Sequence, residues 1–515
     1  MNNEHLINPI SFVMFAIFIA ITGVITYWAS KKSKSGGEYF TAGGKISAGQ
    51  NALALSGEYL SAAALLGITG ALALGGFKGI IYSIGFVAGW PLILFLASET
   101  VRRLGKYTLT DVIAWRLHKR SIRIAVTLAC LPVVFLYLIT QLVAGGGLIK
   151  LMFGLPYGYS VSIVVVIMLA YVFFGGMLGT TWVQIIKAVM LFTGAGLLTV
   201  LVIAYFDFDV STIFKQVAKS SGEQFLLPPV MSNMDKWDML SLAIAVLFGN
   251  LGMPHILSRF LTVKNAKDAR RSAFYATAII SIFHIFVLIL GFGALAILGK
   301  DAILAAGGGG NMAVPLLSKL LGGDVFFGFI CAVSFATMLA VIAGLTLSAA
   351  TMFAHDIWAG VIIKNQEVAQ KQQPVVARVS AVVVSLLAVF LALKFEGQNV
   401  AFMVGLSYSI AASAIFPALM LAIFWRGATT NGLVAGMLIG ALTAISLILL
   451  SPTVQVDLLS GSLPDLSSKW WFFPMKNPSL FSMPIAFAVA IVVSKLRPNF
   501  SEASGYTEMQ RQLEL

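Results

Sequence analysis

Apolar residues in this chain gather in long unbroken runs, and polar or charged residues stand between them. A helix that spans a membrane needs roughly 20 apolar residues, whereas membrane strands alternate and never give such runs. By this rule the sequence predicts thirteen spanning helices. They lie near residues 9–29, 48–74, 79–100, 122–149, 156–174, 180–206, 237–260, 272–299, 324–358, 376–393, 400–425, 431–451 and 479–496.

Lysine and arginine are unevenly divided between the loops on the two sides of these helices. The first run has no Lys or Arg before it and is followed by Lys31, Lys32 and Lys34, the reverse of a secretory signal. With the N-terminus outside, the inner loops, helix ends and tail hold 23 Lys and Arg, and the outer loops hold 10. Because inner loops carry the excess of basic residues, the sequence predicts an N-out, C-in topology.

Composition supports the same fold class. Of 515 residues, 59% are hydrophobic and 11% charged, while soluble domains are nearer a quarter charged. This excludes a soluble enzyme, a disordered chain and a secreted disulfide scaffold. The net charge of +13 is then an orientation signal in a lipid bilayer rather than a nucleic-acid surface. Cys130 and Cys331 lie in apolar runs as small core residues, and we expect no cofactor and no metal cluster.

No domain boundary interrupts the chain. We expect residues 1–515 to form a single transmembrane transporter domain with a core over about 48–425. The remaining parts are peripheral helices near 9–29, 431–451 and 479–496 and a polar, flexible cytoplasmic tail at 498–515.

Two of the predicted helices carry helix-breaking residues near their middle. The second contains Ser56–Gly67 and the seventh contains Gly249–Ile256, five helices later and running in the opposite direction. Broken backbone at membrane depth survives where it lines a cavity, and a matched pair marks a midplane site in an inverted repeat. We expect Ser61 to cap one half-helix and Pro254 to begin the other. Two half-helix N-termini that face one cavity favour a small anion.

Several stretches resemble the sodium:solute symporter family. They correspond to its loop after the third helix, its Gly-Gly…Trp signature and the end of its seventh helix, and they are Leu104–Leu117, Phe174–Gln184 and Pro254–Phe260. Other stretches look most like the bacterial acetate permease branch, namely Tyr39–Gly44, Thr181–Lys187, Gly252–Leu257 and Asn399–Leu406. The resemblance implies thirteen helices with a 5+5 inverted-repeat core. It also implies symport of acetate and similar short monocarboxylates with sodium across a bacterial inner membrane.

Residues at the two breaks and on the fourth and eleventh helices are the candidate contacts for a small carboxylate. They are Ser61, Ala62, Gln141, Gly252, Met253, His255 and Tyr408. Tyr137, Ser407 and Ser409 are further candidates to line the cavity. A lone histidine in an apolar helix is often a core residue, and its place at the break favours a functional role for His255.

The cation site departs from the family pattern. Two hydroxyl residues typical of the ninth helix fall on Ala340 and Val341, which offer no side-chain oxygen, and an Asp of the sixth helix falls on Gln184. Hard cations need oxygen ligands, so coupling to Na⁺ is favoured by the family and opposed by the ligands. Lys187, one turn after Gln184, either occupies the vacated site and carries a proton or extends to the cytoplasmic surface.

Glu58 is the other candidate for coupling. It is a proton carrier, a cation ligand or the partner of a cation such as Lys187, and backbone carbonyls near Tyr59 are further cation ligands. Beside a carboxylate substrate, Glu58 must be protonated, paired or turned away, because like charges repel. Arg259 at the end of the seventh helix is more suited to an anchor or gate than to a substrate contact.

These features favour a secondary active symporter that works by alternating access. The nearest alternative is the same fold with another solute, such as pyruvate, propionate or an amino acid. A channel would need a continuous polar pore. A membrane enzyme would need a nucleophile or a His–carboxylate pair, and His355-Asp356 are neighbours in the chain that do not face each other on a helix.

Overall fold

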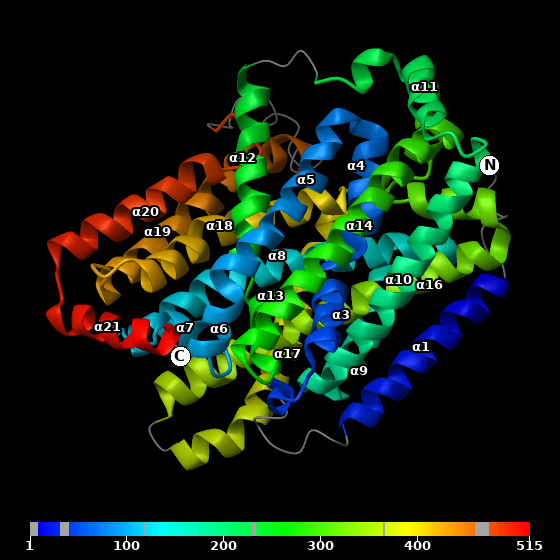
Figure 1. Cartoon of the computed structure of the whole chain (residues 1–515). Coiled ribbons are helices and arrows are strands. Elements are labelled where there is room, and N and C mark those ends of the chain that lie inside the picture. Colours follow the sequence, from blue (N-terminus) through cyan, green and yellow to red (C-terminus); the bar gives the residue numbers. More distant parts are fainter. Residues whose placement is uncertain are drawn as a thin grey trace.

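The structure is a computed structural model, and the description below covers the residues that it places. These are residues 9–30, 41–117, 119–174, 176–228, 233–363, 366–458 and 473–514. Within them the chain is helical nearly throughout, and the only extended pairing is an isolated bridge between Ile46 and Val263. The predicted all-helical class is therefore confirmed (Figure 1).

The first half of the fold contains the following helices, in chain order: α1 (Pro9–Ser30), η2 (Ala42–Gly44), α3 (Ala48–Tyr59), η3 (Ala63–Gly67), α4 (Ile68–Gly75), α5 (Phe77–Leu92), η4 (Ile93–Ala97), α6 (Ser98–Leu104), α7 (Leu109–Ile113), α8 (Lys119–Phe153), α9 (Tyr157–Phe174) and α10 (Gly176–Tyr205). The second half continues with α11 (Val210–Ser221), η5 (Glu223–Phe225), α12 (Asn233–Gly249), η6 (Asn250–Gly252), α13 (Pro254–Ser258), η7 (Arg259–Thr262), α14 (Ala266–Leu298), α15 (Lys300–Ala305), η8 (Gly308–Gly310), α16 (Ala313–Thr351), η9 (Met352–Ile362), α17 (Gln366–Ala392), η10 (Leu393–Phe395), α18 (Val400–Phe424), α19 (Thr430–Leu449), η11 (Thr453–Leu458), α20 (Ser479–Leu496) and α21 (Phe500–Glu514).

Helices of this length and apolarity make the chain a polytopic membrane protein. Among the described residues, 10 helices are long and apolar enough to cross a bilayer, or 11 if the bent pair of α3 with η3 and α4 is one span. A helix lies over every run that the sequence predicts to be a span. This count does not include α1 or α9, and α9 contains a shorter apolar stretch, Tyr157–Ile167.

The predicted break in the second helix is present. The chain bends by 53° between Tyr59 and Ala63, and the backbone of Leu60 leaves the helical region with ψ at 76°. The expected cap is wrong, however. The Ser61 hydroxyl accepts a hydrogen bond from the Tyr137 hydroxyl at 3.4 Å, and no side chain caps the half-helix that follows. The Ser61 backbone carbonyl instead accepts from Ala64 and Leu65 N–H.

The predicted break in the seventh helix is also present, and here the expected role of proline holds. Met253 is extended, with φ −84° and ψ 106°, and Pro254 begins the next helix at its first turn. A proline fits that position because its missing N–H would have no partner inside the helix.

Close packing places both breaks against neighbouring helices. A Cβ at Gly57 would overlap the backbone carbonyl of Gln184, so α3 rests directly on α10. A Cβ at Gly249 would likewise overlap the Tyr408 carbonyl, so α12 rests on α18. Small residues allow this approach of helix backbones, which is how helices associate in lipid.

Four arginines mark one end of the molecule. This end carries Arg102, Arg116, Arg123 and Arg270, whose partners come from loops and helix ends, and we call it the basic face. The opposite end carries α11 (Figure 1).

The residues after Arg497 do not form the expected flexible tail. They form α21, which lies on the basic face beside α6 (Figure 1). The Glu502 carboxylate, 8% exposed, accepts from the N–H and hydroxyl of Thr430 at 2.9 and 2.6 Å, where α19 begins. Arg116 donates to the carbonyls of Glu502 and Trp425 at 2.9 Å each. A charged cap at a helix N-terminus explains why this polar segment is held in place.

Candidate functional site

A continuous row of aromatic rings connects the two helix breaks. Tyr59 stands immediately before the first break and His255 immediately after the second. Neighbouring ring centroids in this row lie between 5.0 and 6.4 Å apart. The order of the rings is Trp90, Tyr59, Phe86, Tyr408, Tyr137 and His255. All of these rings are buried, so they form an apolar wall across the middle of the protein.

Polar atoms without partners lie on and beside this wall. Both amide atoms of Gln141 and both ring nitrogens of His255 have no hydrogen-bond partner among the described residues, and both side chains are buried. The Ser407 hydroxyl on α18 is buried and lacks a partner in the same part of the structure. A buried polar group left unsatisfied costs about 1–3 kcal/mol. Several such groups between two helix breaks therefore indicate a place where a polar ligand binds.

The other residues predicted to contact substrate are placed as follows. Ala62 follows Ser61 at the first break and is buried, and Met253 is the extended residue of the second break. Gly252 lies against the backbone of Ala411 on α18, where any side chain would overlap. These three contribute backbone rather than polar side chains.

Tyr59 is held by a short relay of polar side chains. Its hydroxyl lies 3.4 Å from His284 Nε2, and the Ser83 hydroxyl lies 2.8 Å from His284 Nδ1. His284, which the sequence analysis did not assign to the site, thus connects α14 and α5 to the residue before the first break.

Glu58 does not pair with Lys187. It accepts from Arg259 Nη2 at 2.5 Å and Nε at 3.2 Å, in an ion pair whose side chains are 0% and 2% exposed. Arg259 Nη1 donates to the Thr181 hydroxyl at 2.8 Å. The sequence left several roles open for Glu58, and the structure shows its carboxylate paired with a cationic side chain. Arg259 is its partner rather than a surface anchor.

Lys187 is fully buried, so the alternative that it extends to the surface is wrong. Its Nζ donates to the backbone carbonyl of Thr337 on α16 at 3.1 Å. One turn earlier on α10, Gln184 donates to Glu58 Oε2 at 2.8 Å and to the Ala340 carbonyl at 3.1 Å. Glu58, Gln184, Lys187 and Arg259 form what we call the core charge cluster.

Two acceptor oxygens of this cluster remain open. Glu58 Oε1 and Gln184 Oε1 are buried and have no hydrogen-bond partner among the described residues. Glu58 Oε1 points at Gly344 on α16, where a Cβ would overlap it. Ala340 and Val341 are buried in the same helix, and Ala340 provides only its backbone carbonyl. Either open oxygen is chemically able to ligate a small cation, and the Glu58 oxygen is also able to accept a proton.

A narrow pocket leads from the core charge cluster toward the basic face. Its volume is about 20 Å³, room for about one water molecule. Glu58, His255 and Arg259 lie at its inner end. The rest of its lining comes from the loop before α7 and from α10, α13, α16 and η9: Tyr107, Thr108, Leu109, Met177, Thr180, Pro254, Ser258, Gly344, Leu347, Ser348, Thr351 and Met352.

Paired helix breaks, a buried polar site between them and buried charges beside it define a membrane transporter with a midplane binding site. The chain belongs to the sodium:solute symporter family, whose family model matches residues 39–440. It is therefore a secondary symporter rather than an enzyme, and the family implies a solute and a coupling cation.

Solved transporters share this fold. A Na⁺-coupled sialic acid symporter, in a substrate-bound outward-open state described as revealing a novel Na⁺ site, has a TM-score of 0.74. It is 19% identical, and the match covers 95% of this chain and 99% of that one. Mhp1, a nucleobase-cation-symport-1 family transporter in a closed conformation with bromovinylhydantoin bound, has a TM-score of 0.53 at 13% identity, covering 92% of this chain and 99% of that one. At these identities the likeness concerns the fold.

Proposed function

We propose that this symporter imports acetate and similar short monocarboxylates together with a proton that Lys187 carries. The observation that carries the proposal is the full burial of Lys187 beside an ion pair that is already neutral. The proposal includes thirteen spans, an N-out and C-in orientation with the basic face in the cytoplasm, and a bacterial inner membrane.

The unsatisfied polar groups between the breaks support a carboxylate substrate. Gln141 Nε2 and a protonated nitrogen of His255 are hydrogen-bond donors, and the Tyr137 hydroxyl lies against Ser61 in the same region. Two carboxylate oxygens with their lone pairs match several convergent donors. The aromatic wall suits a short hydrocarbon tail, and its close ring contacts favour acetate, propionate or pyruvate over a large solute.

Charge balance supports proton coupling. Glu58 and Arg259 cancel, so the core charge cluster is neutral when Lys187 is neutral and carries +1 when Lys187 is protonated. An uncompensated charge in the membrane interior is costly. A carboxylate that binds with the protonated lysine restores neutrality, and the empty carrier returns with the lysine deprotonated. One proton then accompanies each carboxylate without net charge movement.

Sodium remains the second candidate because the family is named for it and two acceptor oxygens are open. In that case Glu58 Oε1, Gln184 Oε1 and the backbone carbonyls near Tyr59 and Ala340 would be the ligands. The two candidates differ in what happens when Lys187 is changed.

The test is uptake of labelled acetate into proteoliposomes under a proton gradient or a sodium gradient imposed separately. Protein-free vesicles give the passive entry of undissociated acid. We expect the proton gradient alone to drive protein-dependent accumulation, and Lys187→Ala to reduce it to the background. Lys150→Ala is the matched control, because Lys150 is 53% exposed and pairs with Glu396 at the opposite end.

Lys187→Arg sharpens the test because arginine holds its proton throughout the accessible pH range. We expect it to retain acetate–acetate exchange and to lose net uptake. Accumulation driven by sodium alone, with Lys187→Ala unaffected, would overturn the proton-coupled mechanism. If neither gradient concentrates acetate, the substrate proposal is overturned and the family assignment stays intact.

A further inference from the structure

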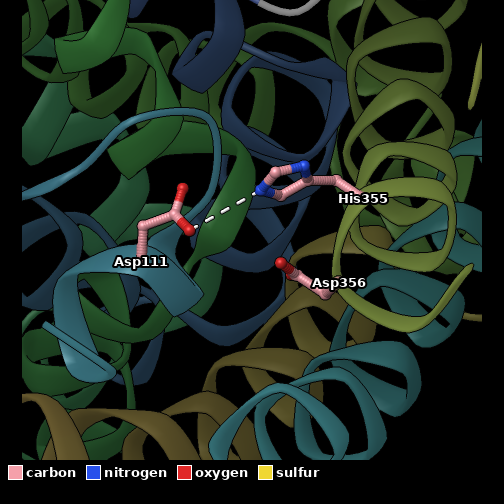
Figure 2. Close-up of side chains that lie close together, drawn as sticks. All are labelled: Asp111, His355 and Asp356. Carbon is pink, nitrogen blue, oxygen red and sulfur yellow. Dashed lines mark ion pairs between the residues drawn. The ribbon is translucent and has the colours of Figure 1, made fainter. Parts of the chain in front are cut away.

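Four ionisable side chains gather on the basic face, close in the chain to residues that line the narrow pocket. We call Asp111, Arg123, His355 and Asp356 the mouth cluster. Arg123 on α8 donates to Asp111 Oδ1 and to Asp356 Oδ1, each at 3.3 Å. His355 Nε2 lies 3.6 Å from Asp111 Oδ1, and Figure 2 shows the imidazole turned toward that carboxylate.

Arg123 distinguishes this cluster from a metal site. The ligand atoms of Asp111, His355 and Asp356 lie within 4.8 Å of one another, a spacing that a metal ion would accept. The guanidinium already contacts both carboxylates, and the Asp356 carboxylate also accepts from the hydroxyls of Thr110 at 2.8 Å and Thr108 at 3.2 Å. A divalent cation would have to displace a positive charge that the protein provides.

The cluster ties together the parts that form the pocket wall. Asp111 lies in α7, directly after Tyr107, Thr108 and Leu109, which line the pocket. His355 and Asp356 lie in η9, directly after the lining residues Thr351 and Met352 of α16 and η9. Any opening of the pocket toward the basic face must separate these two walls.

We propose that His355 is a pH-sensitive latch, which on protonation binds Asp111 and holds the pocket closed toward the basic face. The His355–Asp111 contact is 3.6 Å, just beyond hydrogen-bond distance, and both side chains are only 12–13% exposed. A gained positive charge turns this near contact into a charge-assisted hydrogen bond, which is shorter and stronger than a neutral one. Histidine ordinarily changes charge near pH 6.5, within the range of a cell interior under acid load.

The surroundings of His355 favour this direction of the switch. Asp111 faces the imidazole with its negative charge. Asp356, the next residue in the chain, is held by Arg123, which also donates to the His355 carbonyl at 3.2 Å. The Tyr107 ring packs edge-on against the imidazole at 5.1 Å. The Lys106 ammonium lies over the same Tyr107 ring. Arg259 lies farther along the same pocket.

Asp111 stays ionised over the whole range in which histidine titrates. Burial raises the pKa of the Asp111 carboxyl, but His355 and the N–H groups of Tyr107 and Thr108 lower the pKa to about 2 overall. Only the histidine side of the pair then changes charge. When the imidazole is protonated the closed mouth gains an ion pair with Asp111, and when it is neutral the mouth opens more readily.

The latch does not depend on which solute is carried. If the solute is a weak acid that enters with a proton, as proposed above, import acidifies the compartment that the basic face contacts. The latch would then slow further import as that compartment becomes acidic.

The test measures access to the pocket directly. A cysteine introduced by Thr351→Cys lines the pocket wall, and Cys130 and Cys331 are fully buried and give little background. We expect a membrane-impermeant maleimide to label this position about fivefold more slowly at about pH 5.5 than at about pH 7.5, the upper end for a partly exposed ion pair. Ser504→Cys, exposed on α21, corrects for the intrinsic pH dependence of the thiol reaction.

Two substitutions of His355 determine the sign. His355→Gln should remove the pH dependence and label rapidly at both pH values, whereas His355→Lys should label slowly at both. Ser348→Cys provides a second position in the pocket wall. A pH dependence that survives in His355→Gln, or no labelling at either cysteine at any pH, would overturn the latch. Neither result would bear on acetate uptake or on Lys187.

Discussion

The core charge cluster and the mouth cluster both join carboxylates to an arginine, but they satisfy those carboxylates differently. In the mouth cluster Asp356 accepts from two threonine hydroxyls and from Arg123. In the core charge cluster three donors converge on one oxygen of Glu58, and the other oxygen has no partner among the described residues. Both carboxylates are buried, and the one in the mouth cluster is the more completely hydrogen-bonded.

The two clusters therefore suit different tasks, since one holds structural elements together and the other can exchange a ligand or a proton. A carboxylate with all its acceptors filled fixes two elements against each other. A buried carboxylate with an open oxygen carries a free-energy cost that a ligand or proton relieves. The core therefore retains an unsatisfied carboxylate oxygen at the proposed ion site, while the carboxylates of the mouth have the bonds that keep the walls together.

The largest effect that would test this comparison comes from removing the arginine of the core. Arg259→Met leaves Glu58 as an unpaired buried charge, which costs about 3–5 kcal/mol. We expect a large fall in thermal stability of the detergent-purified protein, measured by the temperature at which its tryptophan fluorescence changes.

The double variant Glu58→Gln/Arg259→Met is the matched control. With both charges gone, much of the stability should return, and the transport function should not. If the single and double variants are equally destabilised, Arg259 acts through packing rather than through charge.

A smaller effect is expected where the open oxygen meets α16. Gly344→Ala places a methyl group against Glu58 Oε1, and overpacking of this kind costs about 1–3 kcal/mol. Gly49→Ala is the control, since nothing lies near a Cβ there and alanine favours a helix by about 0.5–1 kcal/mol. Thermal unfolding of the two variants should shift in opposite directions. Equal shifts would show that Glu58 moves aside freely.

The smallest of the three effects belongs to the mouth. Asp356→Asn keeps the shape and the threonine contacts but loses the charge opposite Arg123, at a cost of about 1.5 kcal/mol. Glu396→Gln breaks the exposed pair with Lys150 and should cost less than about 0.5 kcal/mol. The measurement compares the stabilities of Asp356→Asn and Glu396→Gln in the same detergent. If Glu396→Gln lost as much stability as Asp356→Asn, the buried carboxylate of the mouth cluster would hold the fold no better than an exposed ion pair.

The sequence was sufficient for the features that depend on neighbours in the chain. The apolar runs, both breaks and the place of Pro254 follow from local composition and backbone chemistry, and the structure confirms them. The wrong role for Ser61 has a tertiary cause, because its hydroxyl meets Tyr137 from α8 instead of the backbone beyond it.

Neighbours in the sequence could not predict which charged side chains pair with each other. Glu58, Lys187 and Arg259 stand out as charges in apolar runs, but Glu58 meets Arg259 across 201 positions, and a shift of one residue in helix rotation would exchange its partner. Asp111 and Asp356 are 245 positions apart in the chain and are joined by Arg123, which donates to both carboxylates. The useful signal was that all these charges fall at or near predicted helix breaks or ends.

The docking of α21 has a consequence for the order in which the protein is made. Thr430, at the start of α19, obtains its carboxylate partner from Glu502, 72 positions later. At about 5–20 residues per second, that partner emerges roughly 4–14 s after Thr430 does. The Thr429 hydroxyl caps the first turn of α19 locally, but Thr430 must wait through the synthesis of α20 for its carboxylate partner. A ribosome that pauses in that interval leaves the basic face unfinished and open to proteases.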